Sequence, residues 1–172
     1  MNLLSGRDRP AINLKKSFRK QDHMEMTIVE RRLRVFLLGL AGFMCAGTVV
    51  ELLLAKHTET AIQLIPFVLC GLGLIAVIAA LLRPRRGTLV ALRVVMGLLI
   101  AGSLLGVYEH VEHNLEFALE IRPNAALSDI WFKGISGANP LLAPGILSLA
   151  AVIAIAATYY HPALGKRPVD PR

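Results

Sequence analysis

Four runs of about twenty apolar residues constrain the fold of this chain more than any other feature of its sequence. They cover residues 35–54, 61–82, 89–108 and 141–160. A helix of about 20 residues spans the hydrocarbon core of a bilayer, roughly 30 Å. A strand of a membrane β-barrel would instead show about ten residues that alternate between apolar and polar. The pattern therefore predicts an all-α integral membrane bundle of four transmembrane helices.

Composition agrees with this prediction. Hydrophobic residues make up 55% of the 172 residues and charged residues 18%, whereas a soluble domain carries about 25% charged residues. The net charge of +7 would suit nucleic acid only if the basic side chains shared one folded face. They lie instead in short blocks between the apolar runs, so we expect the lipid bilayer as partner and no nucleic acid.

The polar segments divide the chain into a basic tail (1–33), a transmembrane domain (34–160) and a second tail (161–172). Short connections predict that the first three helices alternate in direction and that the fourth packs against them. The longer excursion, residues 109–140, predicts a short interfacial helix whose apolar residues are Leu127, Ile130, Trp131 and Ile135. Ser128 or Asn124 is its expected N-cap, and Gly134 and Gly137 are expected to loosen the chain. Asn139 and Pro140 are expected to begin the last helix.

Lysine and arginine predict the orientation of these helices. Sixteen of them lie in the two tails, in the connection between the second and third runs, and at Arg34 and Arg93, whereas the opposite side carries Lys56, Arg122 and Lys133. By the positive-inside rule, both termini are cytoplasmic. The compact loops suggest a bacterial-type inner membrane.

The apolar runs offer little chemistry. Charged residues are absent from their centres, where transporters and pumps ordinarily place them, and we find no nucleotide-binding loop or catalytic constellation. Pairs of small residues four positions apart, such as Gly102 and Gly106, are suited to helix contacts within the chain, in a homo-oligomer, or with another membrane protein. The sequence therefore favours a non-enzymatic accessory or interaction subunit.

Two cysteines in neighbouring runs are predicted to lie at similar depth. Cys45 is ten residues beyond Val35, and Cys70 is twelve residues before Leu82 in the antiparallel second run. Buried thiols usually serve as small apolar side chains, although a soft-metal or redox pair is an alternative.

An acidic stripe is predicted where the third helix continues beyond its apolar run. At about 100° per residue, one face carries Glu109, Glu112, His113, Glu116 and Glu120. Carboxylates and imidazoles at i+3 and i+4 spacing can reach a common cation. The candidate ligands of a divalent metal are Glu109, Glu112, His113, Glu116, His110, Glu51 and His57.

Three other interpretations of this stripe stay open. It can be a solvated acidic face, as most helical charge runs are. It can be the site of a membrane enzyme, which the sequence supports less. Haem bound by His57 and His110 or His113 is disfavoured, because b-type haem ligands ordinarily lie deeper and lack flanking carboxylates.

Overall fold

The computed structural model describes the backbone of residues 8–164 and the side chains of residues 27–164 other than Leu127 and Asp129. Over this range the chain is helical and contains no strand, which confirms the all-α class. Its elements are α1 (Asp8–Leu54), the 3-10 turn η1 (Ile62–Leu64), α2 (Ile65–Leu82), α3 (Arg86–Ile121), α4 (Leu127–Ser136), α5 (Leu142–Ala157) and the 3-10 turn η2 (Pro162–Leu164).

Three segments of the described chain are long and apolar enough to cross a membrane: Thr27–Leu54, Ile62–Leu82 and Arg86–Ile121. The fourth apolar run forms α5, which has 16 residues and is about 24 Å long at 1.5 Å per residue. It ends at Ala157, and the hydroxyl of the C-cap residue Thr158 donates a hydrogen bond to the Ile155 carbonyl at 2.7 Å. The chain then turns through Tyr160, whose φ is 50°.

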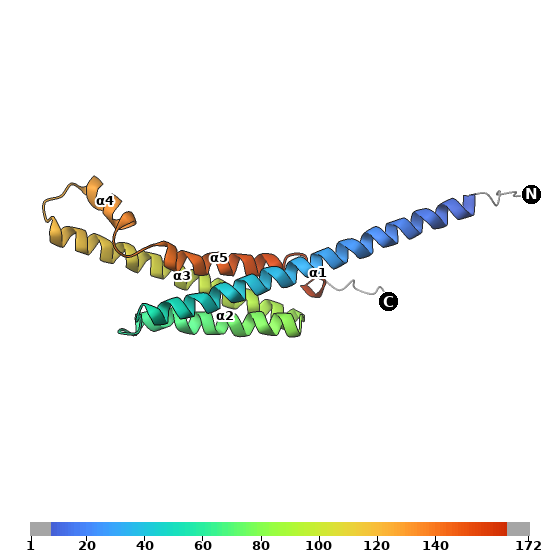
Figure 1. Cartoon of the computed structure of the whole chain (residues 1–172), viewed down its shortest axis with the longest axis horizontal. Helices are drawn as coiled ribbons and strands as arrows, with labels where there is room; N and C mark the ends of the chain where they lie inside the picture. Colours follow the sequence, from blue (N-terminus) through green and yellow to red (C-terminus); the bar gives the residue numbers. More distant parts are fainter. Residues whose placement is uncertain (1–7, 165–172) are drawn as a thin grey trace, which may run out of the picture.

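The four long helices close into a ring. α1 packs against α2 and α5, and α3 packs against the same two helices from the other side. Successive helices run in opposite directions along the bundle (Figure 1). The α2–α3 connection, the end of α5 and the residues of α1 that precede the bundle therefore lie at the same end.

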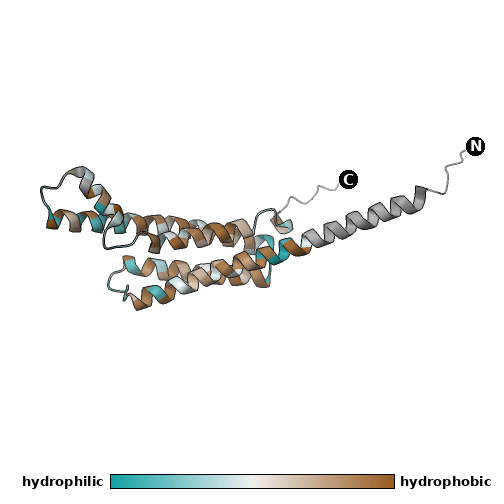
Figure 2. Cartoon of the chain, turned by 45° about the horizontal axis from the view of Figure 1, so that its top comes forward, coloured by the Kyte–Doolittle hydropathy of each residue, from teal (hydrophilic) through white to brown (hydrophobic). Residues whose placement is uncertain are grey.

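The inside of this ring is lined by small and apolar side chains. Ala41, Ala150 and Ala154 are fully buried, together with Leu92 and Met96. Hydrophobic residues predominate along all four helices (Figure 2), and many of them lie on the outside of the bundle; Phe43, for example, is 74% exposed. A bundle that is apolar on every face is suited to lipid rather than to water.

Glycines permit the closest helix contacts. A Cβ at Gly102 would lie 2.3 Å from Leu69 Cδ1, and a Cβ at Gly106 would lie 3.0 Å from Pro144 Cβ. Beside them, the buried Ser103 hydroxyl donates to the Pro144 carbonyl and accepts a hydrogen bond from Ser148 at 2.8 Å. The pair of small residues in α3 thus serves contacts within this chain.

Two capping predictions are wrong. α4 begins after Ala126 and α5 after Leu141, and neither helix has a side-chain cap. Asn139, the expected cap of the last helix, lies before Leu141, and its backbone N–H donates to Asn114.

Candidate functional site

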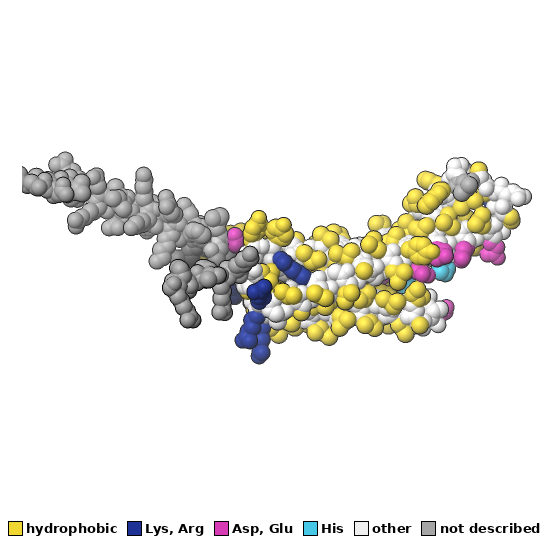
Figure 3. Space-filling model, turned by 180° about the vertical axis from the view of Figure 1, so that it is seen from behind, with side chains coloured by type: hydrophobic (Ala, Val, Ile, Leu, Met, Phe, Trp, Pro, Cys, Tyr) yellow, Lys and Arg dark blue, Asp and Glu magenta, His cyan; other side chains and the backbone are white. Residues whose placement is uncertain are grey.

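The two ends of the bundle carry opposite charges. Figure 3 shows Lys and Arg side chains at one end, and Asp and Glu side chains gathered mainly at the other, with an apolar surface between them. The described arginines of the basic end come from α1 before residue 35, from the α2–α3 connection and from the beginning of α3. This separation follows the distribution of charge along the sequence, because the helices alternate in direction.

A helical hairpin extends the acidic end. The 36 residues of α3 make a helix about 54 Å long at 1.5 Å per residue, which exceeds a 30 Å hydrocarbon core by about 24 Å. α4 folds back and packs on this extension (Figure 1). We call the segment from Glu109 to Pro140 the α3–α4 hairpin.

Asn114 holds the hairpin together. Its side chain is 3% exposed, and its Nδ2 donates to the carbonyls of Gly134 at 3.1 Å and Asn139 at 3.0 Å. Its Oδ1 accepts the Asn139 N–H at 2.9 Å. One buried amide of α3 therefore fixes both the end of α4 and the connection to α5.

The two glycines near Asn114 allow close packing and do not loosen the chain, contrary to the prediction. A Cβ at Gly137 would lie 2.4 Å from Asn114 Cγ, and a Cβ at Gly134 would lie 2.8 Å from Leu115 Cδ2. At Gly137 an added Cβ would also lie 2.7 Å from the backbone oxygen of Lys133, so a larger residue there would displace the connection after α4, whereas at Gly134 the obstacle is the flexible side chain of Leu115.

The predicted stripe lies on the continuous helix α3. His113 is exposed, and its Nδ1 lies 2.8 Å from the Glu109 carbonyl oxygen. His110 is half-buried, and its Nδ1 lies 2.9 Å from the Pro140 carbonyl oxygen. A carbonyl only accepts, so each Nδ1 carries the hydrogen and a neutral imidazole keeps its Nε2 lone pair available.

The structure does not gather the candidate ligands into one site. Within the described part of the chain, no group of three or more His, Cys, Asp or Glu side chains is placed to hold a metal ion. Glu51 and His57 lie at the end of α1 and in the loop after it, and α1 packs against α2 and α5 rather than against the hairpin. The metal site therefore stays a prediction.

α4 exposes a run of large apolar side chains. Trp131 is 58% exposed, Phe132 71% and Ile135 60%. Because these residues lie in the hairpin and outside the ring of four helices, the bundle does not cover them. They form a surface that lipid or another protein can bury.

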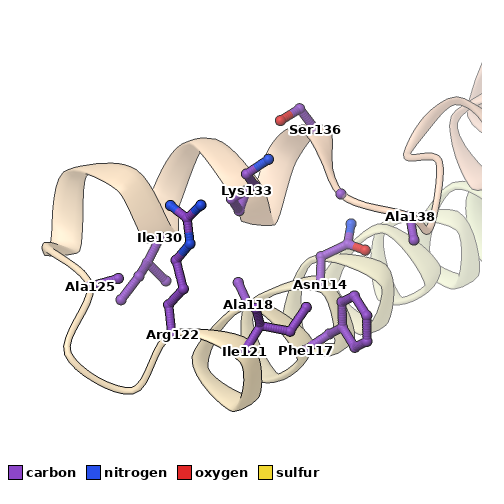
Figure 4. Close-up of a pocket in the computed structure, with 11 residues that line it drawn as sticks. Asn114, Phe117, Ala118, Ile121, Arg122, Ala125, Ile130, Lys133, Ser136 and Ala138 are labelled. Atoms are coloured by element: carbon purple, nitrogen blue, oxygen red, sulfur yellow. The ribbon is translucent and has the colours of Figure 1, made fainter.

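A groove of about 510 Å³ lies between α3 and α4 (Figure 4). Its described apolar wall includes Phe117, Ala118, Ile121, Ala125 and Ile130. Two basic residues also line it: Arg122, which follows α3, and Lys133 of α4. In Figure 4 the Arg122 side chain rises from the end of α3 toward α4.

Two arginines stabilise the basic end. Arg93 donates to the Thr158 hydroxyl at 2.8 Å and to its carbonyl at 3.2 Å, and Arg34 donates to the Tyr160 carbonyl at 3.2 Å. Cations are favourable beside the carbonyls at a helix C-terminus. Burial and the nearby Arg34 guanidinium lower the pKa of His161 below its usual value.

The two cysteines lie together, as their positions predict. Cys45 of α1 and Cys70 of α2 are fully buried, and their side chains lie close enough to interact. Cys45 also borders Gly73, where an added Cβ would lie 3.4 Å from its sulfur.

Sequence reasoning missed Asn114 as the centre of the hairpin. A lone asparagine between acidic residues resembles one more solvated side chain, and its partners are backbone groups 20 and 25 residues away.

No family model, curated protein or solved structure matches the chain.

Proposed function

We propose that this chain is a four-span protein of a bacterial-type inner membrane, with both termini cytoplasmic, and that it acts as a non-enzymatic accessory or interaction subunit. In this proposal α5 is the fourth span, and the residues that flank it at both ends complete the membrane crossing. α4 lies at the outer membrane interface and presents the docking surface. The partner is another membrane protein or a second copy of the chain.

The exposed apolar surface of α4 is the observation that carries this proposal. Trp131 and Phe132 are more than half exposed, although α4 is anchored to α3 by hydrogen bonds and tight glycine contacts. A rigidly held aromatic surface is typical of interaction sites, because aromatic anchors provide much of the binding energy of protein interfaces.

The interior of the bundle supports a role other than transport. Its buried polar side chains include Thr48, Ser103 and Thr158, and each of these hydroxyls is hydrogen-bonded within the bundle. Polar side chains used in this way stabilise helix packing and do not form a path for ions.

Site-specific photo-crosslinking tests the proposal. A photoreactive phenylalanine analogue replaces Phe132 in one variant and Phe43, which is also exposed, in a control variant. We expect one discrete polypeptide adduct from position 132 and none from position 43, with mass spectrometry showing whether it is a second copy or a different chain. The absence of a discrete adduct at position 132 would contradict the proposal.

A second candidate function, the binding or sensing of a divalent metal, is favoured by the histidine geometry. His110 and His113 both donate Nδ1–H to backbone carbonyls, an arrangement that orients imidazole ligands in metal sites. Glu109, Glu112 and Glu116 would add carboxylates, and Glu51 and His57 would have to approach from α1.

Zinc titration tests this second candidate. We expect His113→Ala to weaken Zn²⁺ binding and His161→Ala, at the basic end, to leave it unchanged. Affinity should fall on acidification, because protons compete with the metal for the neutral imidazole. Equal zinc binding by the wild type and the His113 variant would exclude a site at this position.

A further inference from the structure

The charged residues of the α3–α4 hairpin are separated around its groove. Residues 109–140 contain five acidic residues and two basic ones. Both basic residues, Arg122 and Lys133, line the groove, whereas its described lining includes no acidic residue. Among the described side chains neither makes a salt bridge. The described lining of the groove is therefore positively charged within an acidic segment, and it favours an anion.

The rest of the groove is suited to an apolar chain. Phe117 is 56% exposed and Ile121 is 62% exposed, and both belong to its wall together with Ile130. Asn114 also borders the groove, but its amide is already hydrogen-bonded within the hairpin. The groove thus offers two cations for a head group and apolar side chains for a tail.

We propose that this groove binds a single-chain amphiphile with an anionic head group, for which a long-chain fatty acid is the reference ligand. The Arg122 guanidinium offers the planar pair of donors that a carboxylate accepts, and Lys133 adds a second positive charge. The volume of about 510 Å³ lies in the range of small-molecule sites, roughly 300–1,000 Å³. The inference goes beyond a role as an interaction subunit and does not depend on it.

Photo-labelling in membranes tests the proposal. Membranes that contain the full chain receive a photoactivatable palmitic acid or the matching photoactivatable hexadecanol, and mass spectrometry locates the labelled peptides. We expect palmitic acid to label residues 114–138, and hexadecanol to label them about tenfold less, because a charge-assisted hydrogen bond contributes about that factor. This comparison uses the unaltered protein and requires no variant.

Matched variants assign the labelling to the two cations. Arg122→Gln with Lys133→Gln should reduce labelling of the groove about tenfold, whereas Lys56→Gln, a cation outside the groove, should not. A variant with Arg122→Lys and Lys133→Gln should regain part of the labelling that the double glutamine variant loses, because a positive charge returns to position 122.

Three results would overturn the proposal. They are equal labelling by the acid and the alcohol, equal labelling of the double variant and the wild type, and complete competition by a two-chain phosphatidylglycerol, which would assign the groove to ordinary membrane lipid. Failure here leaves the partner experiment at Phe132 unaffected, because Phe132 is not among the residues that line the groove.

Discussion

Asn114 shows how a single side chain can determine the position of a whole element. Its amide makes three hydrogen bonds, one to a carbonyl near the end of α4 and two to backbone groups of Asn139 in the segment that joins α4 to α5. A buried amide has a definite position only when its partners are in place, and buried backbone groups must be satisfied in turn. The orientation of α4 therefore depends on this residue of α3 as well as on the α4 sequence.

Replacement of Asn114 by Leu should release the hairpin. The change leaves the Asn139 N–H and the two carbonyls without their partner, and each buried unsatisfied group costs about 1–3 kcal/mol. We expect faster hydrogen–deuterium exchange across residues 127–139 and a lower unfolding temperature in detergent. Asn124→Leu, at an exposed position, is the control, and equal exchange in both variants would refute a central role for Asn114.

At the scale of elements, glycine positions decide how closely α3 approaches its neighbours. Gly106 faces the rigid ring of Pro144 in α5, while Gly97 on the same helix has no atom within 4 Å of an added Cβ. The same residue type thus has two different consequences along one helix, because only one of the two positions lies in a helix contact.

Alanine at these two positions should have opposite effects. Gly106→Ala forces α5 away from α3, and overpacking of this kind costs about 1–3 kcal/mol. Gly97→Ala meets no obstacle and should raise stability by about 0.5–1 kcal/mol through helix propensity. Thermal unfolding in detergent measures both changes. If Gly106→Ala left the thermal stability unchanged, the contact between α3 and α5 would not be close enough to exclude a methyl group, contrary to this prediction.

The contact between α1 and α2 brings two thiols together and can be tested chemically. Oxidation by diamide should join Cys45 and Cys70 in one disulfide, with loss of two hydrogens from the chain and reduction of diamide to its hydrazine. We expect a mass decrease of about 2 Da and no free thiol, whereas Cys45→Ser keeps one thiol that reacts after denaturation. If both thiols of the wild type stay reactive after denaturation, the two helices do not pair as described.

At the scale of the whole molecule, the bundle has a basic end and an acidic end, and its surface between the two ends is apolar. Positive residues stay on the cytoplasmic side during insertion, whereas acidic residues have little influence. The basic end of the bundle is therefore the cytoplasmic one in our proposal, and the hairpin projects to the outside.

Thiol labelling tests this orientation. In a variant without Cys45 and Cys70, Thr58→Cys in the loop after α1 should react with a membrane-impermeant maleimide in intact cells. Gly87→Cys, exposed at the beginning of α3, should react only after the membrane is opened. Reaction of position 58 solely from the cytoplasmic side would reverse the proposed topology.

Features that depend on residues close in sequence were predictable. The apolar runs predicted the all-α class and the long third helix, which extends to Ile121, because periodicity and breakers act locally. The similar depth of Cys45 and Cys70 followed from helix rise and antiparallel order, whereas their contact also required that the two helix faces meet. The helix α4 was also predicted, although its expected caps, Ser128 or Asn124, were wrong because no side chain caps it.

Features that depend on distant contacts required the tertiary structure. From the sequence alone, Gly134 and Gly137 are expected to loosen the chain, and only the tertiary structure places Leu115 and Asn114 against them. Arg122 and Lys133 line the same groove only because α4 folds back on α3. Hydrophobicity and helix geometry follow from the order of residues along the chain. Close packing and buried hydrogen bonds instead depend on which helix faces align, and in this protein that alignment created the hairpin and its groove.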